Sequence, residues 1–98
     1  MVKMFYLSGC PYCKQAFKAI EELKAEDPRF GAVSIEMIEE SEDPETAEKY
    51  DYYYVPTMYV REEKIYEAHR GETYEECKEN VKKVFLKELE QQAFNIVN

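Results

Sequence analysis

Apolar and polar positions follow one another along the chain in blocks whose spacing predicts strands and helices. Residues 2–7 are almost all apolar, which is typical of a central strand in a sheet that is covered on both faces. From Pro11 onward, apolar side chains recur at helical spacing and share one face: Cys13, Ala16, Phe17, Ile20 and Leu23. Asp27 and Pro28 predict the end of this helix, because the residue before a proline is disfavoured in the α conformation.

The middle of the chain predicts a second strand and a short helix. Residues 33–38 carry apolar side chains at alternate positions, and their distance from the first strand matches a crossover through the first helix. Such strand-helix-strand units are parallel and right-handed in nearly all proteins. Residues 39–43 are acidic and predict a solvated turn that caps a helix over residues 44–50. The acidic run lacks the ligand order of a hard-cation site, which disfavours a metal-binding interpretation.

The last third of the chain predicts a hairpin and a long helix. Residues 58–60 and 65–68 form two strands whose short polar connection makes them antiparallel. Thr73 and Glu76 have the spacing of a capping box at the start of a helix over residues 73–92. One face of this helix is apolar: Tyr74, Cys77, Val81, Val84, Phe85 and Leu89.

Length and charge limit the classes of function. The 98 residues are the size of one domain, residues 1–98. The formal net charge of −8 argues against nucleic acid as a partner, because phosphate binding needs clustered Lys and Arg, and it disfavours anionic membranes. The apolar run at residues 1–7 is too short for a signal peptide, so the expected location is the reducing cytoplasm. Residues 93–97 are apolar enough to dock on the domain or on a second subunit, and the sequence does not choose.

Two cysteines at the start of the first helix are the main chemical feature. Cys10 and Cys13 are three residues apart, so the two thiols can pair with each other. The free N–H groups and partial positive charge of a helix start favour thiolate, which makes Cys10 a nucleophile at neutral pH. Pro11 suits the first helical position, since its φ is already helical and no intrahelical N–H bond is lost. Cys13 begins the buried face, so Cys10 is expected to attack.

A metal half-site and a structural disulfide are the alternative interpretations of these cysteines. A four-ligand zinc site needs two further ligands, and only Cys77 and His69 remain as soft candidates, without ligand spacing of their own. Cys77 itself belongs to the apolar helix face and is interpreted as a small buried hydrophobe. Redox chemistry is favoured over both alternatives, and no metal site is expected.

The stretch from Leu7 to Cys13 resembles the active-site loop of the glutaredoxins, within the thioredoxin superfamily. Val55-Pro56-Thr57 resembles a segment of that superfamily whose proline is cis and faces the dithiol. The resemblance covers the whole chain. It implies the α/β thioredoxin fold, a four-stranded mixed sheet in the order 2-1-3-4 with helices on both faces. It also implies a thiol-disulfide oxidoreductase that reduces protein or glutathione mixed disulfides.

The resemblance assigns roles to particular residues. It implies that Cys10 attacks a substrate disulfide and that Cys13 resolves the resulting mixed disulfide. The main chain of Val55, next to Pro56, is expected to pair with an extended substrate. Tyr12 is a candidate for the rim of the dithiol, where a rigid amphipathic ring supplies contact area.

A second binding element is expected before the last helix. Gly71 to Thr73 resembles the family's loop that holds the glutamyl carboxylate of glutathione, although Gly71 is alternatively a turn residue before an N-cap at Thr73. Arg70 replaces the first glycine of that loop, and Leu7 stands where many glutaredoxins place a basic residue. These departures favour a protein disulfide over a glutathione mixed disulfide as the substrate.

The resemblance also implies a branch of the superfamily and a set of partners. Gly9 and Met4 stand where thioredoxins carry a Trp and a buried Asp, which favours the glutaredoxin branch. The expected partners are protein disulfides, and glutathione or a thioredoxin or glutaredoxin reductase restores the dithiol. Glutathione is a possible reductant, and no tightly bound cofactor is expected. Two rival functions stay open on the same fold: an iron-sulfur cluster held by Cys10 of two subunits, and a redox-inert protein-interaction module.

The remaining aromatic residues divide into core and rim. Tyr50 and Tyr52 are most simply core residues, whereas Tyr53 and Tyr54 are further candidates for the rim of the dithiol. His69 is the single histidine, and we interpret it as a satisfied residue at the end of a strand.

Overall fold

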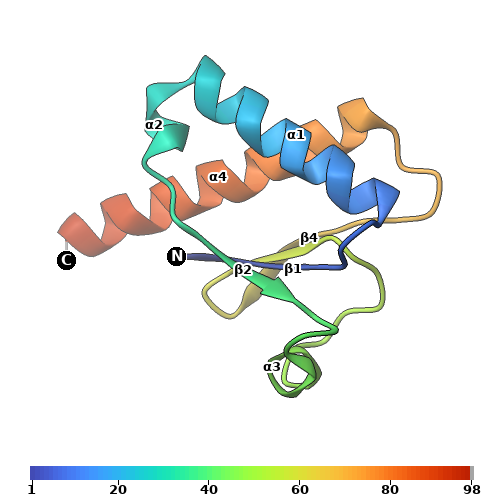
Figure 1. Ribbon diagram of the computed structural model, residues 1–98. Coiled ribbons are helices and arrows are strands. Elements are labelled where there is room, and N and C mark those ends of the chain that lie inside the picture. The colour runs from blue at the N-terminus through green and yellow to red at the C-terminus, as the bar shows by residue number, and fades with distance from the viewer. Residues whose placement is uncertain (98) are drawn as a thin grey trace.

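The computed structural model describes the backbone of residues 1–97 and the side chains of residues 1–94 (Figure 1). Strands and helices alternate along the chain in nearly the predicted order. These elements are β1 (Val2–Tyr6), α1 (Pro11–Glu26), α2 (Pro28–Gly31), β2 (Ile35–Glu39), α3 (Pro44–Glu48), β3 (Thr57–Val60), β4 (Glu63–Glu67) and α4 (Tyr74–Val97).

The strands form one mixed sheet in the order β2-β1-β3-β4. β1 is parallel to β2, with Val2 opposite Ile35, and antiparallel to β3, with Val2 opposite Val60. β3 and β4 form an antiparallel hairpin. The long helices α1 and α4 cover one face of the sheet, and α3 lies on the other (Figure 1). The predicted thioredoxin fold is therefore confirmed, including the parallel crossover between the first two strands.

Side chains of β1 alternate between the two faces of the sheet, so this one strand contributes to two cores. Val2 and Met4 are fully buried in the larger core, together with Phe30 and Phe85, whose ring centroids lie 5.3 Å apart. Phe5 is fully buried in the second core, on the other face. The side chains around it are Ile38, Tyr59, Ala47, Tyr50, Tyr52 and Val55. The interpretation of Tyr50 and Tyr52 as core residues is confirmed.

The connection between α1 and β2 differs from the prediction. The helix end at Asp27 is confirmed, but α2 follows directly, and Asp27 caps it by accepting a hydrogen bond from the Arg29 N–H at 2.9 Å. This short helix brings Phe30 into the core, and β2 begins only at Ile35. Met37 is 44% exposed, because β2 is an edge strand and a hollow of about 680 Å³ lies between it and α1. The strand predicted over residues 33–38 is observed over Ile35–Glu39.

Two smaller boundaries are also shifted. α3 ends at Glu48 and not at residue 50. β4 begins at Glu63, so the hairpin turn shortens to Arg61 and Glu62. Arg61 adopts a left-handed conformation with φ of 57°, which lets the chain reverse within this short turn.

α4 extends beyond the predicted end at residue 92. Residues 93–97, which were expected to form an apolar tail, continue the helix to Val97. The Phe94 side chain is 64% exposed, and the side chains that follow it lie outside the described residues. Docking of this segment therefore stays a prediction.

Candidate active site

Cys10 caps the N-terminus of α1. Its backbone is extended, with φ of −71° and ψ of 124°, and its carbonyl accepts a hydrogen bond from the Lys14 N–H at 3.0 Å. Gly9 turns the chain into the helix with φ of +84°, a conformation that favours glycine. The Cys10 side chain is partly exposed and makes no cap bond. It therefore lies at a helix start whose first-turn N–H groups have no side-chain acceptor.

Cys13 lies one helical turn further on and is fully buried. Its Sγ accepts a hydrogen bond from the Leu7 N–H at 3.5 Å. The pKa of Cys13 is raised to about 12, mainly by burial. The Leu7 N–H acts to lower it, and the neighbouring Cys10 and Glu40 act to raise it. The Cys13 thiol therefore keeps its proton at neutral pH. The predicted difference in accessibility between the two cysteines is confirmed.

The Val55-Pro56 peptide bond is cis, as predicted. Pro56 is buried, and its carbonyl accepts a hydrogen bond from the Ala68 N–H at 3.0 Å. Thr57 pairs with Phe5, so this segment reaches the end of β1 from which the cysteine loop continues. Within the described part of the chain, neither the N–H nor the C=O of Val55 has a hydrogen-bond partner. These two groups are available to an extended polypeptide.

A carboxylate fixes the two residues before Val55. Glu67 Oε2 accepts hydrogen bonds from the N–H of Tyr53 at 2.5 Å and the N–H of Tyr54 at 2.8 Å, and Lys64 Nζ binds Oε1 at 2.6 Å. Burial alone raises the pKa of Glu67, but the hydrogen bonds from Lys64 and the two N–H groups lower it overall. The rings of Tyr53 and Tyr54 are 86% and 54% exposed. Both rings are exposed, and their place at the rim of the dithiol stays a prediction.

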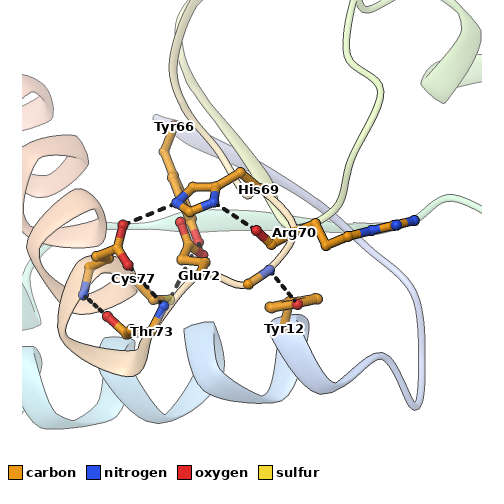
Figure 2. A network of polar contacts seen from close by, with 9 residues as sticks. Tyr12, Tyr66, His69, Arg70, Glu72, Thr73 and Cys77 are labelled. Atoms are coloured by element: carbon orange, nitrogen blue, oxygen red, sulfur yellow. Dashed lines mark hydrogen bonds and ion pairs between the residues drawn. The ribbon is translucent and has the colours of Figure 1, made fainter.

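The loop before α4 contacts the cysteine loop through Tyr12. The Gly71 N–H donates to the Tyr12 hydroxyl at 2.7 Å, a contact that Figure 2 shows. Gly71 has φ of +80°, and the Glu72 N–H closes the turn by donating to the His69 carbonyl at 3.1 Å. The sequence predicted both Tyr12 and Gly71 as site residues but not that they bind each other.

The predicted capping box at the start of α4 is confirmed. The Thr73 N–H donates to Glu76 Oε1 at 3.2 Å, and the Glu76 N–H donates to Thr73 Oγ1 at 3.1 Å. Glu76 also binds His69 Nε2 at 3.1 Å, so the histidine is satisfied, as interpreted. The side chain of Arg70 points away from this network (Figure 2).

Glu72, behind this loop, is a buried carboxyl that was not predicted from the sequence. Glu72 is 3% exposed, its Oε2 accepts a hydrogen bond from the Tyr66 hydroxyl at 2.5 Å, and its Oε1 has no partner among the described residues. The same hydroxyl lies 3.4 Å from the Sγ of Cys77, which is buried as predicted (Figure 2). Burial raises the pKa of Glu72, and the Tyr66 bond offsets this only in part. Nothing in the polar stretch around Glu72 signals that burial.

The acidic run after β2 is only partly the solvated turn that was predicted. Glu39 is 9% exposed and accepts hydrogen bonds from the Ser41 N–H at 2.7 Å and from the Ser8 hydroxyl at 3.3 Å. The bonds from Ser41 come first among the causes that lower the pKa of Glu39. Glu40 Oε1 accepts a hydrogen bond from the Tyr52 hydroxyl at 2.7 Å. Glu39 therefore connects the end of β2 to the loop before Cys10, and Glu40 connects it to the loop before Pro56.

All three cysteines are free thiols. The described side chains contain no group of three or more His, Cys, Asp or Glu that could hold a metal ion. None of the described helices combines the length and the apolar character needed to cross a membrane.

This combination of features defines a class of protein. A sheet in the order β2-β1-β3-β4, a cysteine pair at the start of α1 and a cis proline before β3 belong to a thioredoxin-like domain. The family model described as Thioredoxin domain matches residues 1–79, and the chain belongs to this family. Membership indicates a thiol-disulfide oxidoreductase in general terms.

A solved structure shows the same fold. Thioredoxin 1 from the thermophilic eubacterium Thermosipho africanus TCF52B is 20% identical in sequence and superposes with a TM-score of 0.55. The match covers 84% of this chain and 90% of that chain. No curated protein matches the sequence significantly.

We predict that the two cysteines differ strongly in reactivity. With Cys77→Ser as the background, the Cys13→Ser variant leaves only Cys10, and the Cys10→Ser variant leaves only Cys13. Because Cys13 is buried and protonated, we expect iodoacetamide at pH 7 to alkylate it on the order of a hundredfold more slowly than Cys10. Mass spectrometry over time measures both rates. Equal rates would show that the roles of the two thiols are assigned incorrectly.

We predict that Glu72 makes folding stability fall as the pH rises. Its folded pKa lies above the ordinary value of 4.5, so its contribution is complete below about pH 4.5 and is lost as the pH rises through the folded pKa. Each unit of difference is worth about 1.4 kcal/mol. Urea unfolding from pH 4 to 7 should therefore show wild type losing stability relative to Glu72→Gln.

The matched control is Glu76→Gln. Hydrogen bonds from Thr73 and His69 lower the pKa of Glu76, so its contribution is present at neutral pH and lost as the pH falls through the folded pKa. The two variants should therefore diverge from wild type in opposite directions. A difference between wild type and Glu72→Gln that stays constant with pH contradicts the assignment of Glu72 as a buried carboxyl with a raised pKa.

Proposed function

We propose that the protein reduces disulfides with the pair Cys10 and Cys13. The Cys10 thiolate attacks one sulfur of the substrate disulfide and expels the other as a thiolate, which leaves a mixed disulfide on Cys10. The Cys13 sulfur, after losing its proton, attacks Cys10 and releases the second substrate thiol. The substrate gains two electrons and two protons, and the protein is left with a Cys10–Cys13 disulfide. Glutathione or a thioredoxin or glutaredoxin reductase returns it to the dithiol.

The observation that carries this proposal is the contrast between the two thiols. Cys10 is partly exposed at the start of a helix, whereas Cys13 is fully buried behind it and protonated at neutral pH. The Leu7 N–H donates a hydrogen bond to Cys13 Sγ. This bond stabilises the Cys13 thiolate after the thiol loses its proton. A nucleophile that reacts first and a second thiol that reacts later need this order of accessibility.

The open groups beside the dithiol support a polypeptide substrate. The N–H and C=O of Val55 are free to pair with an extended chain, as in the addition of a strand to a sheet edge. Tyr54, the residue before Val55, adds exposed aromatic surface beside these groups. The Tyr12 hydroxyl is held in place by the Gly71 N–H.

The loop before α4 argues against glutathione as the preferred substrate. A glutamyl carboxylate needs free N–H donors there, but the Gly71 N–H binds Tyr12 and the Thr73 N–H binds Glu76. The Glu76 carboxylate at this loop would repel a second carboxylate. The Glu72 carboxyl beside it has an oxygen without a hydrogen-bond donor among the described residues. We therefore propose a protein disulfide, and not a glutathione mixed disulfide, as the substrate.

We predict that the Cys13→Ser variant accumulates mixed disulfides. It keeps the attacking thiol and lacks the resolving thiol, so incubation with a disulfide-linked peptide should leave one peptide bound to Cys10. Intact mass before and after reduction measures the trapped adduct. Cys77→Ser should still turn over the substrate, because that thiol is buried on α4. An adduct on Cys77, or turnover by Cys10→Ser, contradicts the proposed mechanism.

We predict faster reaction with a peptide-peptide disulfide than with the same peptide linked to glutathione. Pre-reduced protein is mixed with each substrate in a single turnover, so that no regenerating system affects the rate. Since charge-assisted hydrogen bonds to glutathione are missing, we expect at least a roughly tenfold preference for the peptide pair. The reverse preference, abolished by Arg70→Ala but kept in a Lys14→Ala control, would show an ordinary glutaredoxin.

A further inference from the structure

A hollow of about 350 Å³ lies beside the tyrosine run that precedes the cis proline. One side of it is formed by the end of β2 and by α3, and the other by the tyrosines that lead back toward the dithiol. Its charged and aromatic lining residues are Glu40, Glu48, Tyr50, Tyr52 and Tyr53. Pro44 and Ala47 complete the lining, so no Lys, Arg or His contributes to it.

The two carboxylates of this hollow have acceptor capacity to spare. Glu40 uses Oε1 to accept the Tyr52 hydroxyl at 2.7 Å, and within the described residues its other oxygen has no partner. Glu48 is exposed at the end of α3, and the described structure gives its carboxylate no partner. A cationic side chain could bind here through two kinds of interaction. It would donate charge-assisted hydrogen bonds to the carboxylates and make cation–π contacts with the aromatic rings.

The hollow is held in a fixed position next to the dithiol. The Glu40 N–H donates to the Tyr6 carbonyl at 3.0 Å, and the other side of that same peptide unit, the Leu7 N–H, binds Cys13 Sγ at 3.5 Å. The Glu40 carboxylate is close enough to Cys13 to help raise its pKa. Tyr53, on the opposite wall, has its N–H bound by Glu67.

We propose that this hollow binds a lysine or arginine side chain of a polypeptide disulfide substrate. The enzyme then selects cysteines that have a basic residue nearby in the sequence. A chain that runs along the open main chain of Val55 passes Tyr53, two residues away, and can extend a side chain into the hollow. The net charge of −8 also favours encounter with a cationic substrate. The inference rests on the proposed disulfide reduction.

The experiment uses a set of disulfide-linked peptide pairs with one lysine moved along the positions on either side of the cysteine. Each lysine peptide is compared with a peptide that has the uncharged norleucine at the same position. The measured quantity is the ratio of the two second-order rate constants with pre-reduced protein. At one position we expect a ratio of roughly ten, and arginine there should give a similar ratio.

Variants separate contact in the hollow from the general negative field. Glu48→Gln and Glu40→Gln should each lower the ratio toward one. Glu45→Gln is the matched control, because Glu45 is an exposed acid of the same short helix that does not line the hollow. It should leave the ratio near that of wild type.

Three outcomes would overturn the inference. The ratio stays within about twofold of one at every position, or Glu45→Gln lowers it as much as Glu48→Gln, or neither hollow variant lowers it. Failure of the proposed function is a different result, because the norleucine peptides would then also fail to react.

Discussion

The peptide unit that joins Tyr6 to Leu7 holds the candidate site together. Its carbonyl accepts the Glu40 N–H and extends the pairing of β1 with β2, while its N–H donates to Cys13 Sγ. Because a peptide unit is planar and rigid, these two bonds fix the buried thiol relative to the central strand and to the end of the edge strand. β1 is packed on both faces, with Phe5 in one core and Met4 in the other, so it cannot shift without disturbing both. The position of Cys10 at the start of α1 therefore depends on the packing of the whole sheet.

The acidic composition contributes to this architecture as well as to the surface charge. Glu39, Glu67 and Glu76 each accept a hydrogen bond from a backbone N–H in a loop beside the dithiol. The pKa of each is lowered overall, for Glu67 against a burial effect that acts in the other direction. These ionised carboxylates satisfy donors that a loop without regular secondary structure would otherwise leave to water. The loops at the site are therefore set by charge, whereas the sheet beneath them is set by apolar packing.

Features with local causes were predicted from the residues themselves, and the sheet order and the cis proline were predicted from the family resemblance. Contacts between side chains far apart in the sequence were not predicted. The dithiol at a helix start and the capping box depend on residues within one helical turn, and both were found. The short helix α2 was not predicted, and β2 begins at Ile35, two residues later than expected. Glu72 and Glu40 were missed because their partners, Tyr66 and Tyr52, come from other elements of the fold. Side chains of that kind read as surface residues until the tertiary structure encloses them.

The internal hydrogen bonds of the loop before α4 bear on the proposed choice of substrate. A carboxylate ligand at this loop has to displace Tyr12 from the Gly71 N–H and Glu76 from the Thr73 N–H. Exchanging one hydrogen bond for another of the same kind gains little free energy, and the displaced groups then need new partners. Those internal bonds hold the Tyr12 hydroxyl in place at the start of α1, two residues from Cys10. The surface left open, the main chain of Val55 and the acidic hollow beside the tyrosines, is one that suits an extended and positively charged polypeptide.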